Sequence, residues 1–403
     1  MASRTVNWGG FPKAVAAASA QNSHFWKDGG KRFMLARRGT DILREELRRR
    51  LDAGYQGPHE VWIRWPRQLG DVVFALPFFG SLQAAWNAEA AALGVTLRWV
   101  AVGHAIGAAL FSEAAPDFIA ESVIESGGVG KPDPWHLLRR WREAPPVCVI
   151  NLSQSVRLAL GAWMARVPIR GGISDNHLSL LYTHPFKYRD LPIHLAQRYE
   201  PLLEQLTGQR YLQWVRIGRH NLGGGRGPEI LRAAGWAGEP YITLAFGTRG
   251  HVKRWFPETG TWPELARRLS AEGFRCVWLG GPDEVALGKE IAALAPGSLD
   301  LTGQTSLPEA CAIQEAALGN VAIDTGLAHT AAATGRPTLT LMGHSPEPLI
   351  APVGPMAVAI RGSAVDSHRG ESEGFETHGS VAHRVHPERV VGLLKALMAE
   401  ARA

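Results

Sequence analysis

Three short groups of polar residues in this sequence each follow an apolar stretch and carry side chains suited to chemistry. The first is Arg64-Trp-Pro-Arg67-Gln-Leu-Gly70-Asp71, between a predicted strand and a long predicted helix. Ligands of open parallel sheets bind outside the carboxyl ends of the strands, which favours a reacting group at this point. Asp71 is therefore either a general base at an interdomain cleft or a helix N-cap, with Gly70 easing the turn.

The second group is Asp324-Thr325-Gly326-Leu327-Ala328-His329, where the apolar segment NVAI runs into a predicted helix. A Thr-Gly pair at a helix start exposes backbone N–H groups, and the helix dipole adds attraction for an anion. A diphosphate would fit this arrangement. The simpler interpretation is that Asp324 caps the helix and His329 is a packing residue.

The third group is Gly247-Thr248-Arg249 with Lys253-Arg254-Trp255, directly after the apolar segment YITLAF. A hydroxyl and a flexible ammonium that follow a strand are suitable donors to phosphate oxygens. The alternative is a solvated basic loop. Gly280-Gly281-Pro282, after RCVWL, predicts a tight turn close to the nucleotide.

Short apolar segments alternate with helical stretches along most of the 403 residues, which predicts α/β domains with parallel sheets. The length favours two domains. We predict an N-terminal extension at 1–58, a Rossmann-like domain at 59–222, a second at 229–386 and a closing helix at 387–403. The glycine-rich stretch Leu222 to Pro228 is expected to be a hinge between the domains.

Several classes of function are disfavoured. The chain has no dinucleotide fingerprint, no Walker loop and no Asp-x-Asp pair for a metal-bridged diphosphate. Its three cysteines are dispersed, which favours a reducing compartment, and neither a signal peptide nor a long apolar span is evident. We therefore expect a cytoplasmic protein that does not span the membrane. The net charge of +6 favours an anionic partner, although the runs of arginine near residues 37–50 are typical of solvated helix faces.

Three stretches resemble the heptosyltransferases of glycosyltransferase family nine over roughly residues 60 to 400. They are GDVVFALPFFGSL from Gly70, KRWFPETGTWPELARRL from Lys253 and IDTGLAHTAAATGRPTLTLMG from Ile323. The resemblance implies a GT-B fold, with two facing Rossmann-like domains and an interdomain cleft. Two regions depart from the family pattern, namely residues 1–58 and SHRGESEGFETHGSVAH near the end.

The resemblance also implies a reaction and a set of site residues. It implies inverting, metal-independent transfer of heptose from ADP-heptose to a lipopolysaccharide core or related acceptor, without another cofactor. Asp71 is the implied base, and the implied donor-site residues are Thr248, Lys253, Asp324, Thr325, Gly326 and His329. The predicted acceptor-site residues are Arg64, Arg67 and Arg157.

Other functions stay open at this point. One is a related transferase that uses another nucleotide-sugar on a protein or natural product, and another is a non-catalytic module that binds nucleotides or glycans. A peripheral contact with the inner membrane surface also stays open. Nucleic acid is not expected as a partner, because no recognisable binding motif accompanies the basic charge.

Overall fold

The fold is described from a computed structural model of the chain. It describes residues 37–113, 119–124, 134–174, 177–188, 193–217, 226–248, 253–255, 258–343, 346–361 and 385–402. The chain divides into two compact units, Met1–Val215 and Arg216–Ala403. The predicted hinge at 222–228 lies mostly outside the described residues, as does the segment SHRGESEGFETHGSVAH.

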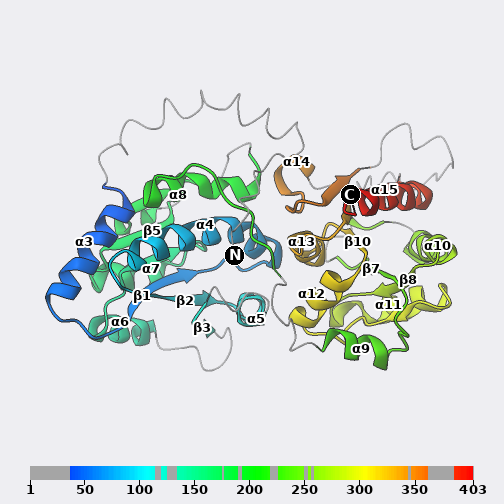
Figure 1. Cartoon of the computed structure of the whole chain (residues 1–403), viewed down its shortest axis with the longest axis horizontal. Helices are drawn as coiled ribbons and strands as arrows, with labels where there is room; N and C mark the ends of the chain where they lie inside the picture. The colour runs from blue at the N-terminus through cyan, green and yellow to red at the C-terminus, as the bar shows by residue number, and fades with distance from the viewer. Residues whose placement is uncertain are drawn as a thin grey trace. The chain divides into compact units, whose positions relative to one another are not determined.

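The first unit is a parallel six-stranded sheet flanked by helices (Figure 1). Its strands are β1 His59–Arg64, β2 Leu97–Gly103, β3 Glu121–Ile124, β4 Cys148–Asn151, β5 Ile169–Ile173 and β6 His184–Phe186. Its helices are α3 Gly39–Asp52, α4 Leu69–Ala91, α5 Ala105–Glu113, α6 Pro134–Glu143, α7 Val156–Met164 and α8 Glu200–Thr207, with two 3₁₀ turns, η3 His177–Leu181 and η4 Leu195–Tyr199.

The second unit is also a parallel six-stranded sheet with helices. Its strands are β7 Tyr241–Ala245, β8 Arg275–Trp278, β9 Leu299–Asp300, β10 Gly319–Ile323, β11 Thr338–Leu341 and β12 Ala357–Ile360. Its helices are α9 Gly227–Ala233, α10 Glu258–Ala271, α11 Val285–Ala293, α12 Leu307–Ala316, α13 Gly326–Ala333, α14 Glu347–Ile350 and α15 Pro387–Glu400, with a 3₁₀ turn, η7 Pro282–Glu284.

The two sheets have the same strand order. It is β3-β2-β1-β4-β5-β6 in the first unit and β12-β11-β10-β7-β8-β9 in the second. Counted along each unit, both orders are 3-2-1-4-5-6, that of a Rossmann fold. The predicted α/β class and the pair of Rossmann-like domains are confirmed.

The central strands are apolar because helices cover both faces of each sheet. Every residue of β4, β7, β10 and β11 is buried. The core of the second unit includes Trp255, Trp262 and Trp278, whose rings meet edge to face. Aromatic pairs of this geometry add stability beyond the area they bury.

Helix α4 carries the first group of polar residues at its start and is largely buried. Among the described residues it is the one helix long and apolar enough to cross a membrane, and most of its apolar stretch is buried inside the unit. Phe79 and Trp86 pack on Trp99 of β2. We therefore interpret α4 as a core helix that fixes the position of its own first turn.

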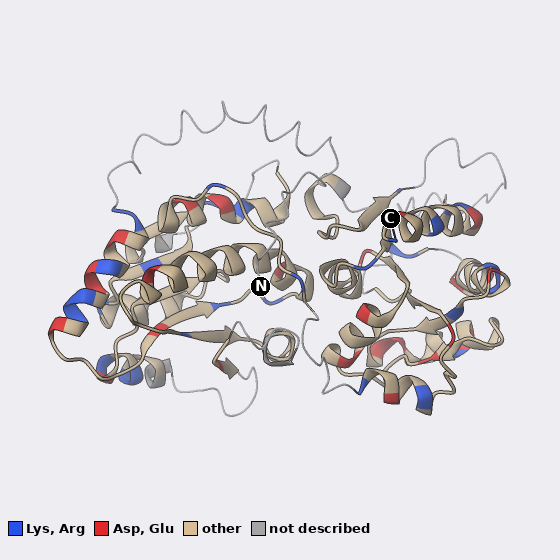
Figure 2. Ribbon diagram, in the orientation of Figure 1, with Lys and Arg blue, Asp and Glu red and all other residues tan. Residues whose placement is uncertain are grey.

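Helix α3, within the predicted extension, packs on this core. Figure 2 shows basic and acidic residues alternating along it. Its Leu43 and Leu47 are fully buried, the Thr40 hydroxyl donates to the Leu206 carbonyl at 3.0 Å, and Arg44 bonds both carboxylate oxygens of Glu89 at 2.5 and 2.6 Å. The described part of the extension therefore belongs to the first unit, and residues 1–36 lie outside the described residues.

The closing helix α15 packs against α10 and β11 in the second unit. Its Val390 and Leu394 are fully buried in the same core as the tryptophan cluster. Lys395 forms an ion pair with Glu272 at 2.6 Å.

Glu200, in the first turn of α8, makes the stability of the first unit depend on pH. Burial, with the nearby Glu204 charge, raises the pKa of Glu200 to about 7. Because burial disfavours the ionised form in the fold, stability falls as pH rises from the unfolded-state pKa through about 7. We expect Glu200→Gln to raise the melting temperature at about pH 8.5 by the equivalent of up to about 3 kcal/mol, and to change it little near pH 4.

The matched control is Glu229→Gln, because Glu229 is an exposed acid in the first turn of α9. Thermal unfolding of both variants at the two pH values checks the prediction. Equal melting temperatures for Glu200→Gln and the parent chain at alkaline pH would contradict it.

Candidate functional site

Predicted site residues lie at the carboxyl edges of both sheets, where the strand order reverses. In the second unit Thr248 follows β7 and Asp324 follows β10, and these strands are neighbours. In the first unit Arg64 ends β1 and Asn151 ends β4, again neighbours. Ligands of doubly wound sheets bind at such switch points, because the helices that follow the two strands cover opposite faces.

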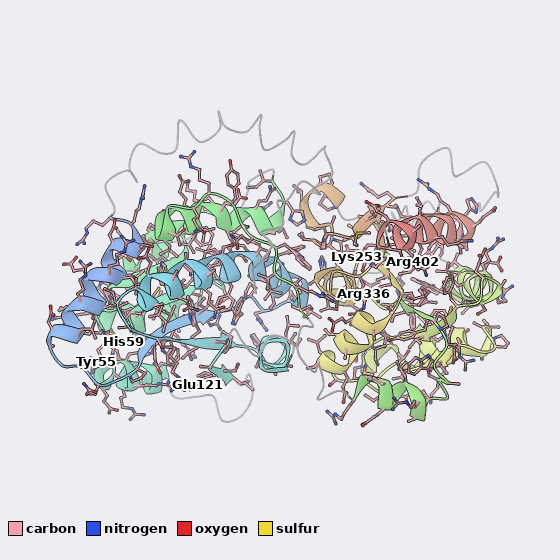
Figure 3. All side chains as sticks on the ribbon, viewed as in Figure 1. Tyr55, His59, Glu121, Lys253, Arg336 and Arg402 are labelled. Atoms are coloured by element: carbon pink, nitrogen blue, oxygen red, sulfur yellow. The ribbon has the colours of Figure 1, made fainter. Side chains whose placement is uncertain are left out.

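Lys253 and Asp324 form an ion pair in the second unit, with Lys253 Nζ 2.8 Å from Asp324 Oδ2. The Asp324 side chain is 3% exposed, whereas that of Lys253 is 32% exposed. Lys253 is labelled in Figure 3. An ammonium has three donors, so Lys253 can lie beside Asp324 and still donate to an anionic ligand. The carboxylate thus positions the lysine.

Helix α13 begins beside this pair. Its N-cap is Thr325, in an extended conformation, and Gly326 is its first residue. Asp324 is therefore not the N-cap, contrary to the simpler interpretation. The first turn presents N–H groups that lack intrahelical acceptors, which is where a phosphate binds.

His329 lies in the middle of α13 and is 5% exposed. The neighbouring Thr330 hydroxyl is bonded to Gln314 Oε1 at 2.8 Å. The helix is thereby attached to α12. This burial suits the packing role that was one alternative for His329.

Glu284 is a site residue that the sequence analysis missed. It ends η7, just beyond β8, and its carboxylate accepts a hydrogen bond from the Gly281 N–H. A Cβ at Gly247, just after β7, would lie 2.2 Å from Glu284 Cδ, so a side chain at 247 would require this carboxylate to move. The glycines predicted to form a tight turn near the nucleotide were the available signal.

Asp71 is the third residue of α4, and Gln68 is the N-cap. The N-cap alternative for Asp71 is therefore wrong. Burial raises the pKa of Asp71 above its ordinary value. The Asp71 charge also acts on the buried Tyr199. The pKa of the Tyr199 phenol is raised first by burial, then by Tyr188 and then by the Asp71 charge. A partly desolvated carboxylate of this kind is a stronger base than one in water.

A polar network joins the carboxyl ends of β1 and β4. Arg64 donates a hydrogen bond to the Ser153 hydroxyl. The fully buried Asn151 accepts from the N–H groups of Ser153 and Ser155 at 3.3 and 3.2 Å, and donates to the Tyr182 hydroxyl at 2.9 Å. Asn151 therefore holds the loop that carries the hydroxyl partner of Arg64.

The loop also contains strained backbone. Gln154 has a φ of 56°, in the left-handed region that residues other than glycine rarely adopt.

Of the other predicted acceptor residues, Arg67 is exposed in the bend before α4, and Arg157 is exposed in the first turn of α7. Arginine side chains that start from neighbouring strand ends suit an anionic acceptor.

No group of three or more His, Cys, Asp or Glu side chains within the described ranges could hold a metal ion. The three cysteines are free and buried.

The Lys253–Asp324 pair should stabilise the second unit. Lys253→Ala leaves a buried carboxylate without its cation, which we expect to lower the free energy of unfolding by about 1–3 kcal/mol, because the lysine is partly exposed. Asp324→Asn added to Lys253→Ala should recover part of this loss. A double-mutant cycle measures the coupling, with the exposed pair Lys395 and Glu272 as a control; additive effects for Lys253 and Asp324 would contradict the pairing.

Asp71 should have the opposite effect on stability. A carboxyl with a raised pKa destabilises the fold once it ionises, so Asp71→Asn should raise the melting temperature above the folded-state pKa. The gain should vanish below the unfolded pKa, at about pH 3. Asp41→Asn, in the first turn of α3, is the control at an exposed helix start. A loss of stability in Asp71→Asn at neutral pH would contradict this account.

Comparisons of the sequence with a family model and with known proteins agree with each other. The sequence model of glycosyltransferase family 9 (heptosyltransferase) matches residues 136–375, more than half of the chain. Lipopolysaccharide heptosyltransferase 1 of Pseudomonas aeruginosa is 37% identical over 113 residues, 26% of this chain and 29% of that protein. Lipopolysaccharide heptosyltransferase 2 of Escherichia coli is 30% identical over 159 residues, 38% of this chain and 45% of that protein. The matches therefore span less than half of these relatives.

Solved structures share the fold. The ADP-heptose lipopolysaccharide heptosyltransferase II of Escherichia coli has a TM-score of 0.67 at 22% identity, covering 85% of this chain and 100% of that chain. A family 9 glycosyltransferase of Veillonella parvula has a TM-score of 0.71 at 20% identity, covering 85% and 97%. The family match includes the Lys253–Asp324 site, whereas Asp71 precedes it. The chain belongs to glycosyltransferase family 9, the heptosyltransferase family.

Proposed function

We propose that the protein is an inverting, metal-independent glycosyltransferase that moves a heptose from ADP-heptose to a lipopolysaccharide core or related acceptor. The observation that carries this proposal is the Lys253–Asp324 pair at the start of α13, a diphosphate-suited site within the part of the chain that matches the family. The relatives named as lipopolysaccharide heptosyltransferases support the sugar and the acceptor class.

The donor would bind at the switch point of the second unit. Lys253, the Thr248 hydroxyl and the N–H groups at Thr325 and Gly326 are cationic or hydrogen-bond donors suited to the diphosphate. They would stabilise the negative charge that develops on the departing ADP. Glu284, beyond the neighbouring strand β8, is an acceptor suited to hydroxyl groups of the nucleotide.

The base would be Asp71 in the first unit. The acceptor oxygen attacks the anomeric carbon from the face opposite the diphosphate and forms the new C–O bond, while Asp71 takes its proton. The bond from the anomeric carbon to the diphosphate oxygen breaks, and ADP leaves with that electron pair. The raised pKa of Asp71 brings its proton affinity closer to working pH, as a general base requires.

The acceptor would be anionic. Arg64, Arg67 and Arg157 supply guanidinium groups that bind phosphate or carboxylate in bidentate fashion. Arg64, held by Ser153, has the most constrained environment of the three. The strained loop fixed by Asn151 is consistent with a ligand-binding surface, because such strain concentrates at functional sites.

Metal independence rests on the chemistry of the donor-site residues. Lys253 and the helix start supply positive charge where other transferases use a divalent cation. A solved relative, TibC, is described as iron-containing, at 14% identity and a TM-score of 0.50. Transfer that survives treatment with EDTA and a strong iron chelator supports the proposal, whereas activity that returns only when metal is added contradicts it.

Replacing the two central residues should separate chemistry from binding. We expect Asp71→Ala to lower turnover by about 10²–10⁴-fold with little change in ADP affinity, because it removes only the proton acceptor. Lys253→Ala should instead weaken ADP binding, and Asp41→Ala should match the parent chain. Mass-spectrometric detection of transfer from a panel of ADP-, GDP-, UDP- and dTDP-sugars, with calorimetry for ADP, measures both effects. Undiminished turnover of Asp71→Ala would remove this residue from the mechanism.

The dependence of kcat/KM on pH provides a further check on the base. Since burial raises the pKa of Asp71, the fall in rate on the acid side should lie above the ordinary pKa of an aspartate, about 3.9. Asp71→Glu should keep a fall in kcat/KM at low pH but shift the pH at which it occurs. Asp71→Asn should leave a residual rate without that fall. An acid limb unchanged by both substitutions would assign it to another group.

A further inference from the structure

Gln314, near the end of α12, is a buried polar residue to which the proposed reaction gives no role. Its side chain is almost completely shielded from solvent, at 1% exposed. Glutamine is mostly a surface residue, because burying its amide is unfavourable unless hydrogen bonds satisfy it. Helix α12 lies beside α13 (Figure 1), and the hydrogen bonds of the Gln314 amide are made to residues of α13.

The Gln314 amide holds two residues of α13 at once. Its Nε2 donates to the Leu327 carbonyl at 2.9 Å, and its Oε1 accepts from the Thr330 hydroxyl at 2.8 Å. The Thr330 hydroxyl also lies 3.1 Å from the Leu327 carbonyl, but it has a single proton to donate. Because a carbonyl oxygen only accepts, the Nε2 end of the amide must face Leu327, and this fixes the orientation of the side chain.

Gln314 is in turn attached to the centre of the sheet. Asn320 Nδ2 donates to the Gln314 carbonyl at 3.4 Å, and the Thr243 hydroxyl donates to Asn320 Oδ1 at 2.5 Å. Thr243 and Asn320 are register partners in β7 and β10, and both are buried. A connected set of buried hydrogen bonds makes a region rigid. Gln314 therefore links α13 to the two strands that form the switch point of the second unit.

The first turn of α13 needs a restraint of this kind. Among the residues that the structure describes, the side chain of its N-cap, Thr325, makes no capping hydrogen bond, and the helix begins with the flexible Gly326. A capping side chain would occupy N–H groups of the first turn, which a diphosphate would need. Gln314 contacts the Leu327 carbonyl and the Thr330 hydroxyl instead. It therefore holds the turn and leaves the N–H groups accessible to a ligand.

We propose that Gln314 is a positioning residue of the donor site, which holds the first turn of α13 in the geometry that receives the diphosphate group of a nucleoside diphosphate. The ligand in this proposal rests on the proposed function, whereas the hydrogen bonds do not. Donors that are fixed before the ligand arrives bind it without the loss of freedom that ordering them would require. A nucleoside without phosphate makes no use of these donors.

The experiment compares ADP with adenosine in Gln314→Met, which keeps the length of the side chain and removes both hydrogen bonds. We expect ADP to bind about tenfold more weakly, as the loss of two hydrogen bonds implies, and adenosine to stay within about twofold of the parent chain. Calorimetry measures ADP, and ligand-observed NMR measures adenosine. Without nucleotide, amide hydrogen exchange at residues 326–331 should be faster in the variant.

Variants of two threonines in α13 separate positioning from stability. Thr330→Val removes the hydroxyl that donates to Gln314 and should weaken ADP binding selectively, whereas Thr330→Ser keeps a hydroxyl and should bind ADP like the parent chain. This pair also serves if Gln314→Met does not fold. Thr334→Val is the matched control, because it removes a buried hydroxyl that donates to the Ala331 carbonyl at 2.6 Å, beyond the end of the helix. It should lower the melting temperature without changing the ratio of ADP to adenosine affinity.

Three outcomes would overturn the proposal. If the parent chain binds ADP and both Gln314→Met and Thr330→Val bind it equally well, the positioning role is wrong and the transferase proposal stands. If ADP and adenosine lose affinity to the same extent, Gln314 has a general structural role. If the parent chain does not bind ADP, the transferase proposal fails and this one fails with it.

Discussion

The reversal of strand order at the middle of each sheet is the constraint on which the functional site depends. Beside β1 and β4, and again beside β7 and β10, the chain continues to helices on opposite faces, so the strand ends remain uncovered there. Polar loops can lie at these edges without entering a core. Arg64 and Asp71 occupy one such edge, and Thr248 and Asp324 occupy the other.

Each edge carries a carboxylate that is shielded from water, but the surroundings of the two carboxylates differ. Asp324 is almost fully buried but is paired with Lys253, so its negative charge positions a cation. Burial raises the pKa of Asp71, which gives it a higher affinity for a proton. A site that stabilises a departing diphosphate needs a positioned cation, as Asp324 provides with Lys253. A proton acceptor needs a raised pKa, as Asp71 has. This difference in environment supports the division of roles more directly than residue type does.

Local patterns predicted much of this arrangement because Rossmann-like units are built from them. Buried strands such as NVAI and the turns after them mark the carboxyl edge, so Asp71, Thr248 and Asp324 could be placed there from spacing alone. Contacts between distant residues could not be predicted. The docking of α3 depends on the contacts of Thr40 with Leu206 and of Arg44 with Glu89. The proximity of Glu284 to Gly247 is likewise evident only in the folded structure. The capping alternatives considered for Asp71 and Asp324 are wrong, since the N-caps are Gln68 and Thr325.

The central claim is that nucleotide binding belongs to the switch point of the second unit and proton transfer to that of the first. Amide hydrogen exchange of the full chain with saturating ADP tests this division most directly, because it reports protection along the whole backbone. The account predicts protection at residues 246–255 and 324–333, with little change at 69–75. Saturating ADP that protects 69–75 and leaves both segments of the second unit unchanged would contradict it.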